Sequence, residues 1–392
     1  MNPKFLIAFL LCTSMYGQVN TDIYLFDLSM DKGNPVLTNP KNISNNEGYD
    51  NQPSFLNNNT VLFSSTRADQ TDIRKFNIEA GSTSSWISNT PTGSEYSPLK
   101  IPGKNAVSAI RLDLDGLQLL YEYDMKTGES MPILDKKVGY HLWYNDHLLI
   151  TTVLVENRMD LFISDLQEGT TRLVQKNVGR SLSKIPDSEL ISFISKSSTP
   201  WQIKSFDPNI GAIDKITDVP KESQDFCWLN ATTILTGIGK SLMKFDTETE
   251  DEWSSVIQFQ LEEINNISRI AINENRTRLA FVAEESPARV VQRQLDAYNA
   301  RDIDAFMATY SNEIKLFEYP NKLFVDSWDK MKNRYALFFE TTPDLHCEIK
   351  NRIVIGNKVI DEEFVTVNGS NFSAVAIYEV ENGKIAKVTF IK

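Results

Sequence analysis

The sequence predicts a multidomain protein, with an all-β six-bladed propeller followed by an α+β cone whose helices pack on a curved antiparallel sheet. Short apolar runs bounded by Asn, Ser and Asp clusters recur along most of the chain and predict the strands of a repeated unit. Near Pro287 the apolar period changes from two residues to 3.6, which predicts helices. The last repeat holds only two strands, and residues near the N-terminus can supply the strands that it lacks.

Composition and charge limit the classes of function. The 392 residues are 41% hydrophobic, which is ordinary for a globular protein long enough for two domains. The net charge of −12 disfavours a nucleic-acid partner, because phosphates need a basic surface. The acidic surface either keeps the protein soluble or forms a face for a basic partner. Cys12, Cys227 and Cys347 show no spacing typical of a disulfide framework or a zinc site.

The first 17 residues resemble a secretory signal peptide, with a positive charge at Lys4, then an apolar run, then small polar residues. The apolar run is too short for a permanent membrane span, and no other stretch approaches that length. We expect cleavage between Gly17 and Gln18 and export to the periplasm or out of the cell. Lipid attachment at Cys12 is disfavoured, because two leucines precede it where small residues are needed.

The clearest copy of the repeat spans residues 48–78. A polar approach leads to a first strand near Pro53, a buried second strand at residues 61–65 and an alternating third strand at residues 72–78. Further first strands are predicted to begin near residues 98, 142, 182, 227 and 269, so the spacing is 40 to 45 residues. This spacing is typical of four-stranded propeller blades.

We expect the N-terminal strands to complete the last blade. The final repeat, residues 266–285, supplies two strands, and residues 22–28 and 35–38 can supply the third and the outer strand. Pairing of residues 22–28 with the strand that ends at Ala283 would close six blades without an open edge. We therefore assign residues 18–286 to the propeller.

This repeat resembles the TolB-type propeller family. The resemblance rests on residues 42–44, the polar approach at 50–55 and the strands at 61–65 and 72–76. It implies a propeller that is often periplasmic and often a binding platform, and it carries over no catalytic residue. We therefore expect a protein partner for the propeller, which the sequence does not identify.

Two local motifs admit either a metal or a structural interpretation. Residues 111–122 partly fit a calcium loop, but predicted strands flank them and they contain an Asp-Gly hairpin turn. His141, Trp143 and His147 are close in sequence, but no third ligand is spaced to join the two histidines. We interpret the first motif as a hairpin, and His141 and Trp143 as packing residues of a blade. No metal site is expected.

Residues 287–392 predict helices followed by a meander of strands, which is an α+β pattern. Ser286 is the predicted cap of a first helix that begins at Pro287. A second helix is predicted from Asp302 through Tyr310, and a third at residues 327–340. Strands are predicted at residues 313–319, 346–355, 358–367, 372–380 and 384–391.

This second part resembles the nuclear transport factor 2-like superfamily, specifically its SnoaL-like and ketosteroid-isomerase-like branch. The resembling residues are 290–293, 298–306, 317–320 and 378–385. The resemblance implies a cone that encloses an apolar pocket. In such a cone we expect either a small apolar ligand or a role in homodimer formation.

The catalytic residues that this resemblance would imply are not matched. Gln294 stands where the family has its oxyanion tyrosine, Tyr319 where it has the base, and Ala376 near its protonated aspartate. Isomerase chemistry of that kind is therefore disfavoured. The remaining candidates for acid–base catalysis are Glu318, His346 and Asp361.

The alternation of strand residues predicts which side chains face the pocket. We expect Tyr319 to point inward and Glu318 outward, because neighbours in a strand face opposite sides. His346 is expected to point outward, and Glu362 and Glu363 are interpreted as solvated charges. The residues that we expect around a ligand are Gln294, Tyr298, Phe306, Phe317, Tyr319 and Tyr378.

Two classes of function remain open. In the first, an exported propeller is an interaction platform and the cone binds a small apolar ligand or dimerises. In the second, the cone is an enzyme of the SnoaL-like or ketosteroid-isomerase-like class that acts on a small hydrophobic substrate by acid–base chemistry. Two carboxyl or imidazole groups facing each other in the cone would favour the enzyme. No cofactor is expected in either class.

Overall fold

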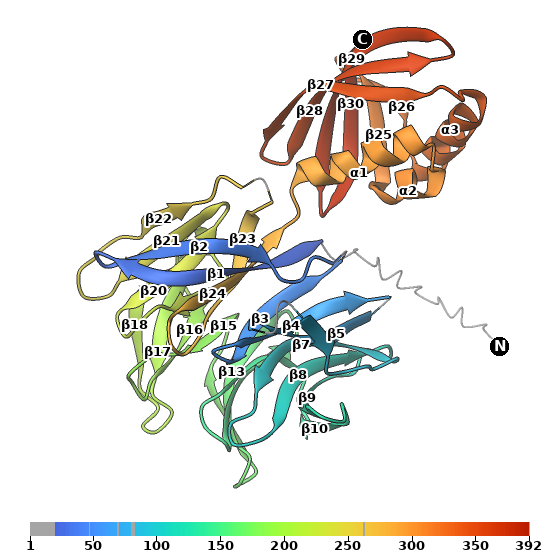
Figure 1. Cartoon of the computed structure of the whole chain (residues 1–392). Coiled ribbons are helices and arrows are strands. Elements are labelled where there is room, and N and C mark those ends of the chain that lie inside the picture. Colours follow the sequence, from blue (N-terminus) through green and yellow to red (C-terminus); the bar gives the residue numbers. More distant parts are fainter. Residues whose placement is uncertain (1–19, 47, 69, 80–82, 262, 392) are drawn as a thin grey trace, which may run out of the picture.

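The computed structural model describes residues 20–46, 48–68, 70–79, 83–261 and 263–391 (Figure 1). The predicted signal peptide, residues 1–17, lies outside the described residues. The described part of the chain is mostly β, with six four-stranded antiparallel sheets, one six-stranded sheet and a few helices. None of its helices has the length and apolar character needed to cross a membrane.

The six four-stranded sheets follow one another along the chain. The first three consist of β3 (Asp50–Asn57), β4 (Thr60–Arg67), β5 (Gln70–Asn77) and β6 (Thr83–Trp86); β7 (Gly93–Lys100), β8 (Ala106–Asp113), β9 (Gln118–Asp124) and β10 (Ser130–Leu134); and β11 (Val138–Trp143), β12 (Leu148–Val155), β13 (Arg158–Asp165) and β14 (Thr170–Gln175).

The other three sheets repeat this arrangement. They consist of β15 (Val178–Lys184), β16 (Ile191–Ser195), β17 (Gln202–Phe206) and β18 (Ile213–Asp218); β19 (Cys227–Trp228), β20 (Thr233–Ile238), β21 (Ser241–Asp246) and β22 (Ser254–Gln258); and β23 (Asn265–Ile272), β24 (Arg278–Glu284), β1 (Thr21–Asp31) and β2 (Asn34–Asn42). A short 3-10 helix, η1 (Pro220–Glu222), precedes β19.

The sixth sheet joins the two ends of this region. Strand β1 pairs antiparallel with β24, with Asp22 opposite Ala283, and β2 lies outside β1. Figure 1 shows these blue N-terminal strands beside the yellow and orange strands from residues near 270. The predicted pairing of residues 22–28 with the strand that ends at Ala283 is therefore confirmed. Its physical basis is the two-strand deficit of the last repeat, which would otherwise leave an exposed edge.

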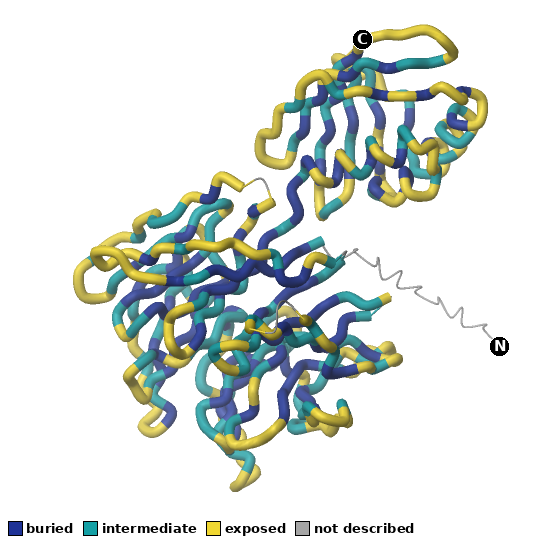
Figure 2. Tube along the Cα trace, viewed as in Figure 1, coloured by how far each residue is buried: buried dark blue, intermediate teal, exposed yellow. Residues whose placement is uncertain are grey.

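Buried apolar clusters hold neighbouring sheets together. One such cluster joins the first and sixth sheets through Phe63 of β4, Ile23 of β1 and Ala280 of β24, all fully buried. Five further clusters of the described residues join the other neighbouring pairs of sheets. In Figure 2 the buried residues lie along the strands, while many of the turns between them are exposed. Burial of apolar side chains between neighbouring sheets therefore stabilises this region.

The chain passes from the last sheet into helix α1 (Pro287–Ala300). The Ser286 hydroxyl accepts a hydrogen bond from the backbone N–H of Ala288, which confirms the predicted cap. Helix α2 (Ile303–Ala308) is capped by Asp302, and helix α3 is Trp328–Thr341. The expectation that α2 reaches Tyr310 is wrong. Tyr310 begins a strand, because its backbone pairs with Ile385.

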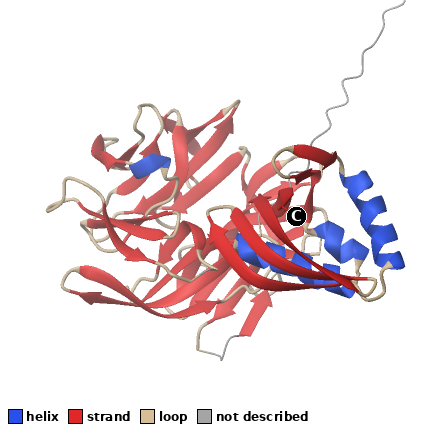
Figure 3. Cartoon of the chain, turned by 90° about the horizontal axis from the view of Figure 1, so that it is seen from above, coloured by secondary structure: helices blue, strands red, loops and turns tan. Residues whose placement is uncertain are grey.

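The six-stranded sheet has the strand order β26-β25-β30-β29-β28-β27. Strands β25 and β30 are parallel, and the other neighbours are antiparallel. Figure 3 shows the helices of this part gathered beside the curved strands. The strands are β25 (Tyr310–Glu318), β26 (Lys322–Val325), β27 (His346–Ile355), β28 (Lys358–Val367), β29 (Ser370–Glu381) and β30 (Lys384–Ile391).

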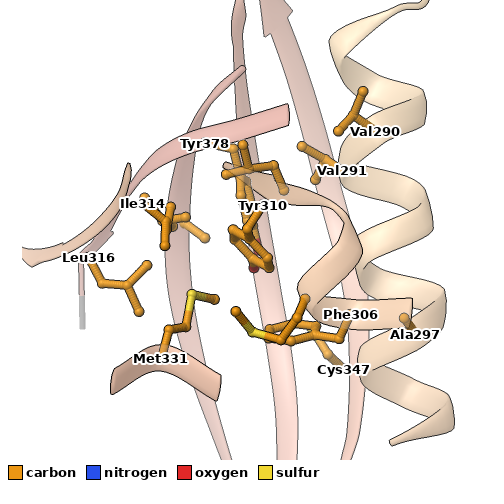
Figure 4. Close-up of a cluster of buried hydrophobic side chains, with 14 of the residues drawn as sticks. Val290, Val291, Ala297, Phe306, Tyr310, Ile314, Leu316, Met331, Cys347 and Tyr378 are labelled. Carbon is orange, nitrogen blue, oxygen red and sulfur yellow. The ribbon is translucent and has the colours of Figure 1, made fainter. Parts of the chain in front are cut away.

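The core of this part lies between the helices and the inner face of the sheet. Figure 4 shows Phe306 of α2, Tyr310 of β25 and Met331 of α3 pointing toward one another. The rings of Phe306 and Tyr310 are 5.0 Å apart between centroids. This layer is continuous with a cavity that the sheet and helices leave open.

Candidate functional site

A cavity of about 400 Å³ lies between α1, α3 and the inner face of the six-stranded sheet. Most of its wall is apolar or aromatic, as in sites for small apolar molecules. Leu337 and Phe372 line it and are 62% and 43% exposed, so they mark its opening to solvent. Other apolar and aromatic lining residues are Leu295, Tyr298, Phe324, Tyr335, Phe338 and Phe390.

Aromatic packing shapes the helical side of the cavity. The Tyr298 ring of α1 lies 6.0 Å from Phe306 and 6.5 Å from both Tyr335 and Phe338, measured between centroids. Phe306 is fully buried behind this wall and does not line the cavity, whereas Tyr298 does. These tilted and edge-on rings pack closely and leave few alternative side-chain positions, so the cavity is largely preformed.

A buried carboxyl group, that of Glu363 on β28, lines the cavity. Its side chain accepts a hydrogen bond of 2.9 Å from the Tyr378 hydroxyl of β29, and Glu363 is only 8% exposed. Burial raises the pKa of Glu363 to about 7, although the hydrogen bond from Tyr378 opposes this rise. Near neutral pH this carboxyl therefore exchanges between its neutral and charged forms.

The interpretation of Glu363 as a solvated charge is wrong, while its neighbour Glu362 is exposed. The structural cause is the register of β28, in which Glu363 lies opposite Ala374 of β29 on the inner face. The small side chain of Ala374, which also lines the cavity, leaves room for the longer carboxylate. The signal available in the sequence was the alternation along β28, which places Glu363 on the same face as the buried Val359 and Val365.

Gln294 of α1 lines the cavity and is 5% exposed. Its Oε1 atom has no hydrogen-bond partner in the described part of the chain. A buried acceptor without a partner costs about 1–3 kcal/mol. An N–H or O–H group of a bound molecule would satisfy this oxygen.

The register of β25 differs from the one expected. Glu318 lines the cavity, while Tyr319 is 65% exposed and Phe317 does not line it. Leu316 is fully buried, and Glu318 is two residues further along the strand on the same face. The expectation that Tyr319 points inward and Glu318 outward is therefore wrong by one residue. The side chain of Glu318 is 38% exposed and bonds Lys322, so it lies on the solvent side of the cavity.

The other two catalytic candidates lie outside the cavity. His346 is exposed on β27, as the alternation predicts. Asp361 is buried on the inner face of β28, but both of its oxygens accept hydrogen bonds of 2.7 Å from Arg352. Arg352 also reaches Gln292 of α1 at 2.8 Å. Asp361 thus fixes the contact between sheet and helix, and of the predicted set Gln294, Tyr298, Tyr378 and Glu318 are brought together around the cavity.

Comparisons with known proteins agree with this description of both parts. The family model of the SnoaL-like domain matches residues 291–388. A cystatin-fold protein from Novosphingobium aromaticivorans is 27% identical over 27% of this chain and 98% of its own, with a TM-score of 0.26. An NTF2-like protein from Cytophaga hutchinsonii is 14% identical over 27% of this chain and 88% of its own, with a TM-score of 0.24.

For the six four-stranded sheets, one similar structure is a putative TolB from Agrobacterium tumefaciens. It covers 68% of this chain and 99% of its own length, with a TM-score of 0.53 and 11% identity. At that identity the likeness defines the fold alone. No curated protein matches the chain. The chain therefore combines a TolB-like fold with a C-terminal SnoaL-like domain.

Proposed function

We propose that this chain is an exported binding protein with two domains. Residues 18–286 form a closed six-bladed propeller that serves as an interaction platform for a protein partner. Residues 287–392 form a cone that binds a small, mostly apolar molecule. Export rests on the signal-like pattern of the first 17 residues, and the mass of the protein recovered after export would reveal cleavage after Gly17.

Contacts between the first strands of the sheets support a closed propeller. Consecutive first strands are in contact from β3 through β7, β11, β15 and β19 to β23, and β23 in turn contacts β3. The apolar cluster between the first and sixth sheets gives this last contact a buried core of its own. A ring without an edge avoids pairing with other chains, which suits an exported platform.

The observation that carries the binding function is the cavity itself. An apolar wall favours apolar ligands by area, and a few polar groups then fix their orientation. Those groups are the unpartnered Gln294 Oε1 and the hydrogen-bonded pair of Glu363 and Tyr378. The ligand class that fits is a neutral ring compound with one hydroxyl or amine group that donates to Gln294 or Glu363.

The test uses 2-naphthol, a neutral fluorescent phenol, as the probe. We expect saturable binding to the whole chain, and a loss of at least tenfold in affinity in Ala374→Trp, because the indole would fill the cavity. Ala305→Trp, at an exposed position of α2, is the matched control and should bind as the native chain does. Equal affinity in the native chain and Ala374→Trp would contradict the proposed site.

Glu363 favours one second candidate, an acid–base enzyme on the same cavity. A base works best when its pKa lies near the working pH, and the pKa of Glu363 is about 7. In this alternative, ionised Glu363 removes a proton next to a carbonyl group of an apolar ketone. The Tyr378 hydroxyl holds the carboxylate in place.

Proton exchange separates the two candidates. Deuterium uptake at the α-carbons of 2-tetralone would be followed by NMR for the native chain, Glu363→Gln and Glu318→Gln. If the chain is only a binding protein, deuterium uptake by 2-tetralone should be as slow with the protein as in buffer alone. Exchange above that rate, lost in Glu363→Gln and retained in Glu318→Gln, would establish the enzyme instead.

A further inference from the structure

The first strands of the six sheets surround a second, smaller cavity of about 140 Å³. Each sheet contributes to its wall, either from its first strand or from the residues just before that strand. These residues are Gln52, Ser97, Tyr140, Arg180, Asp225 and Arg269. The cavity therefore exists only when all six sheets are assembled.

Three charged side chains line this cavity, two arginines and one aspartate. Arg180 Nε donates to Asp225 at 2.8 Å, and its Nη2 atom donates to the other carboxylate oxygen. Arg269 Nη1 lies 3.6 Å from Asp225, and its Nη2 atom donates to the Tyr140 hydroxyl at 3.1 Å. One carboxylate is thus shared by two guanidinium groups, which leaves one positive charge uncompensated among the described lining residues.

The shared carboxylate is firmly ionised. Burial opposes ionisation of Asp225, but Arg269 and Arg180 outweigh it and hold the pKa of this carboxyl below its ordinary value. The same two arginines also line a neighbouring cavity of about 280 Å³, where Glu284 supplies a further negative charge. Among the residues that line the smaller cavity, Arg180, Arg269 and Asp225 together carry a net charge of +1.

His141 adds a buried polar atom without a partner. It lines the smaller cavity, is 5% exposed, and its Nδ1 has no hydrogen-bond partner in the described part of the chain. The Ser108 hydroxyl oxygen lies 2.7 Å from His141 Nε2 and accepts a hydrogen bond from the indole N–H of Trp143 at 2.9 Å.

The short contact with Ser108 decides the tautomer of His141. Burial lowers the pKa of His141 to about 3, so the ring is neutral and carries one proton. We infer that the Ser108 hydroxyl donates its proton to His141 Nε2, which is 2.7 Å away. The alternative acceptor, the carbonyl oxygen of Leu99, is 3.4 Å away. His141 Nε2 is then an acceptor, and the unpartnered Nδ1 carries the proton as a donor.

We propose that this central cavity binds a small carboxylate. Two arginines and the net positive charge of the lining residues are suited to a planar anion with two oxygens, and the buried, unpartnered Nδ1–H group of His141 belongs to a residue of the same wall. The volume equals that of about five water molecules, which matches an acid of the size of acetate or the end of one acidic side chain.

The test uses the chain from residue 18 onward and sodium acetate as the probe, measured by titration calorimetry. We expect saturable binding at acetate concentrations on the order of 1–10 mM. Acetamide, which has the same shape without the charge, should not bind, and sodium chloride at equal ionic strength should give no signal. Equal signals from acetate and acetamide, or no saturable binding of acetate, would overturn the proposal.

Variants locate the site. Arg269→Gln should weaken acetate binding at least tenfold, which is about 1.4 kcal/mol. Arg276→Gln, which removes an exposed arginine paired with Asp187, should leave the affinity unchanged. If circular dichroism shows that Arg269→Gln does not fold, Arg180→Gln is used in its place. The side chain of Arg180 is 25% exposed and that of Arg269 is 13% exposed, so Arg180 tolerates replacement better. Native affinity in the folded arginine variant would refute the site.

Asp225→Asn should have the opposite effect, because it removes the carboxylate that competes with the ligand. Acetate should then bind more tightly than to the native chain, whereas a purely structural role of Asp225 predicts no gain. The carboxylate could belong to a free acid or to an acidic side chain of another protein. Two amidated tripeptides, one with a central glutamate and one with a central glutamine, distinguish these alternatives. Tighter binding of the glutamate peptide than of acetate assigns the site to an acidic side chain, and weaker binding assigns it to a free acid.

Discussion

The cone and the six-sheet region each bury a carboxyl group, but the pKa values of the two groups shift in opposite directions. In the cone, Glu363 has a tyrosine hydroxyl as its hydrogen-bond partner, and burial raises its pKa to about 7. In the six-sheet region, Asp225 lies between Arg180 and Arg269, and its pKa is held below its ordinary value. Both residues are similarly buried, at 8% and 7% exposure, so burial alone does not decide the charge.

The difference indicates which ligand each cavity suits. A carboxyl that is neutral for part of the time in an apolar wall favours an uncharged molecule with one hydrogen-bonding group. A fixed cluster of two positive charges and one negative charge favours an anion. The two cavities should therefore bind different compounds independently, with 2-naphthol in the cone and acetate in the six-sheet region.

The largest effect is expected from removing the N-terminal strands of the six-sheet region. Deletion of residues 20–42 removes β1 and β2 and leaves the edge of β24 open. We expect the six-sheet region to lose cooperative unfolding or to aggregate, together with all acetate binding. Scanning calorimetry and light scattering provide the measurement. A soluble, monomeric deletion protein with the native melting temperature would contradict closure by the N-terminal strands.

A smaller effect is expected when only the charge cluster is broken. Asp225→Asn leaves two arginines sharing no carboxylate, and loss of one partner of a buried pair costs about 3 kcal/mol. Acetate should restore part of the lost stability, because its carboxylate can replace that of Asp225 between the two arginines. Denaturant unfolding with and without acetate measures both changes, and acetamide serves as the control. An equal loss of stability with either additive would contradict the role of charge.

Glu363 should make the stability of the cone depend on pH. Its pKa rises from 4.5 to about 7 on folding, so the unfolded chain loses this proton first as the pH rises. The folded state binds more protons between about pH 4.5 and 7, and the free energy of unfolding falls across that window by up to about 3 kcal/mol. In Glu363→Gln this contribution should be absent, so the variant gains stability relative to the native chain as the pH rises.

Denaturant unfolding at several pH values measures this difference. Glu362→Gln, at the exposed neighbouring position, is the matched control and should follow the native chain. A difference between Glu363→Gln and the native chain that stays constant from pH 4.5 to 8 would contradict the raised pKa.

The smallest effect is expected from removing the hydrogen bond between Tyr378 and Glu363, which opposes the rise in the pKa of Glu363. Tyr378→Phe removes the donor to Glu363 and should cost about 1 kcal/mol of stability. Because that bond lowers the pKa of Glu363, its loss should move the pKa above about 7. NMR titration of the carboxyl carbon of Glu363 gives the value directly. Tyr319→Phe, at an exposed site, is the control. A lower pKa of Glu363 in Tyr378→Phe would contradict the role assigned to the Tyr378 hydrogen bond.

The sequence by itself determined the number of four-stranded repeats and the place where helices begin. The spacing of the repeats predicted six units, and the deficit of the last unit predicted the pairing of β1 with β24. Ser286 and Pro287 marked the start of α1, because a cap and an N-terminal proline act within a few residues. These features depend on local chemistry or on counting, and both can be obtained from one chain.

Only the tertiary structure decided which polar side chains meet. The inward position of Glu318 in place of Tyr319 depends on the register of β25 against β30, and a shift of one residue reverses every side chain. The burial of Glu363 depends on Ala374 of the neighbouring strand. Tyr140 and Arg269 are 129 residues apart, and no local pattern records their contact. The binding that we propose for both cavities depends on such distant contacts, because the charge of a buried group is set by the groups around it in space.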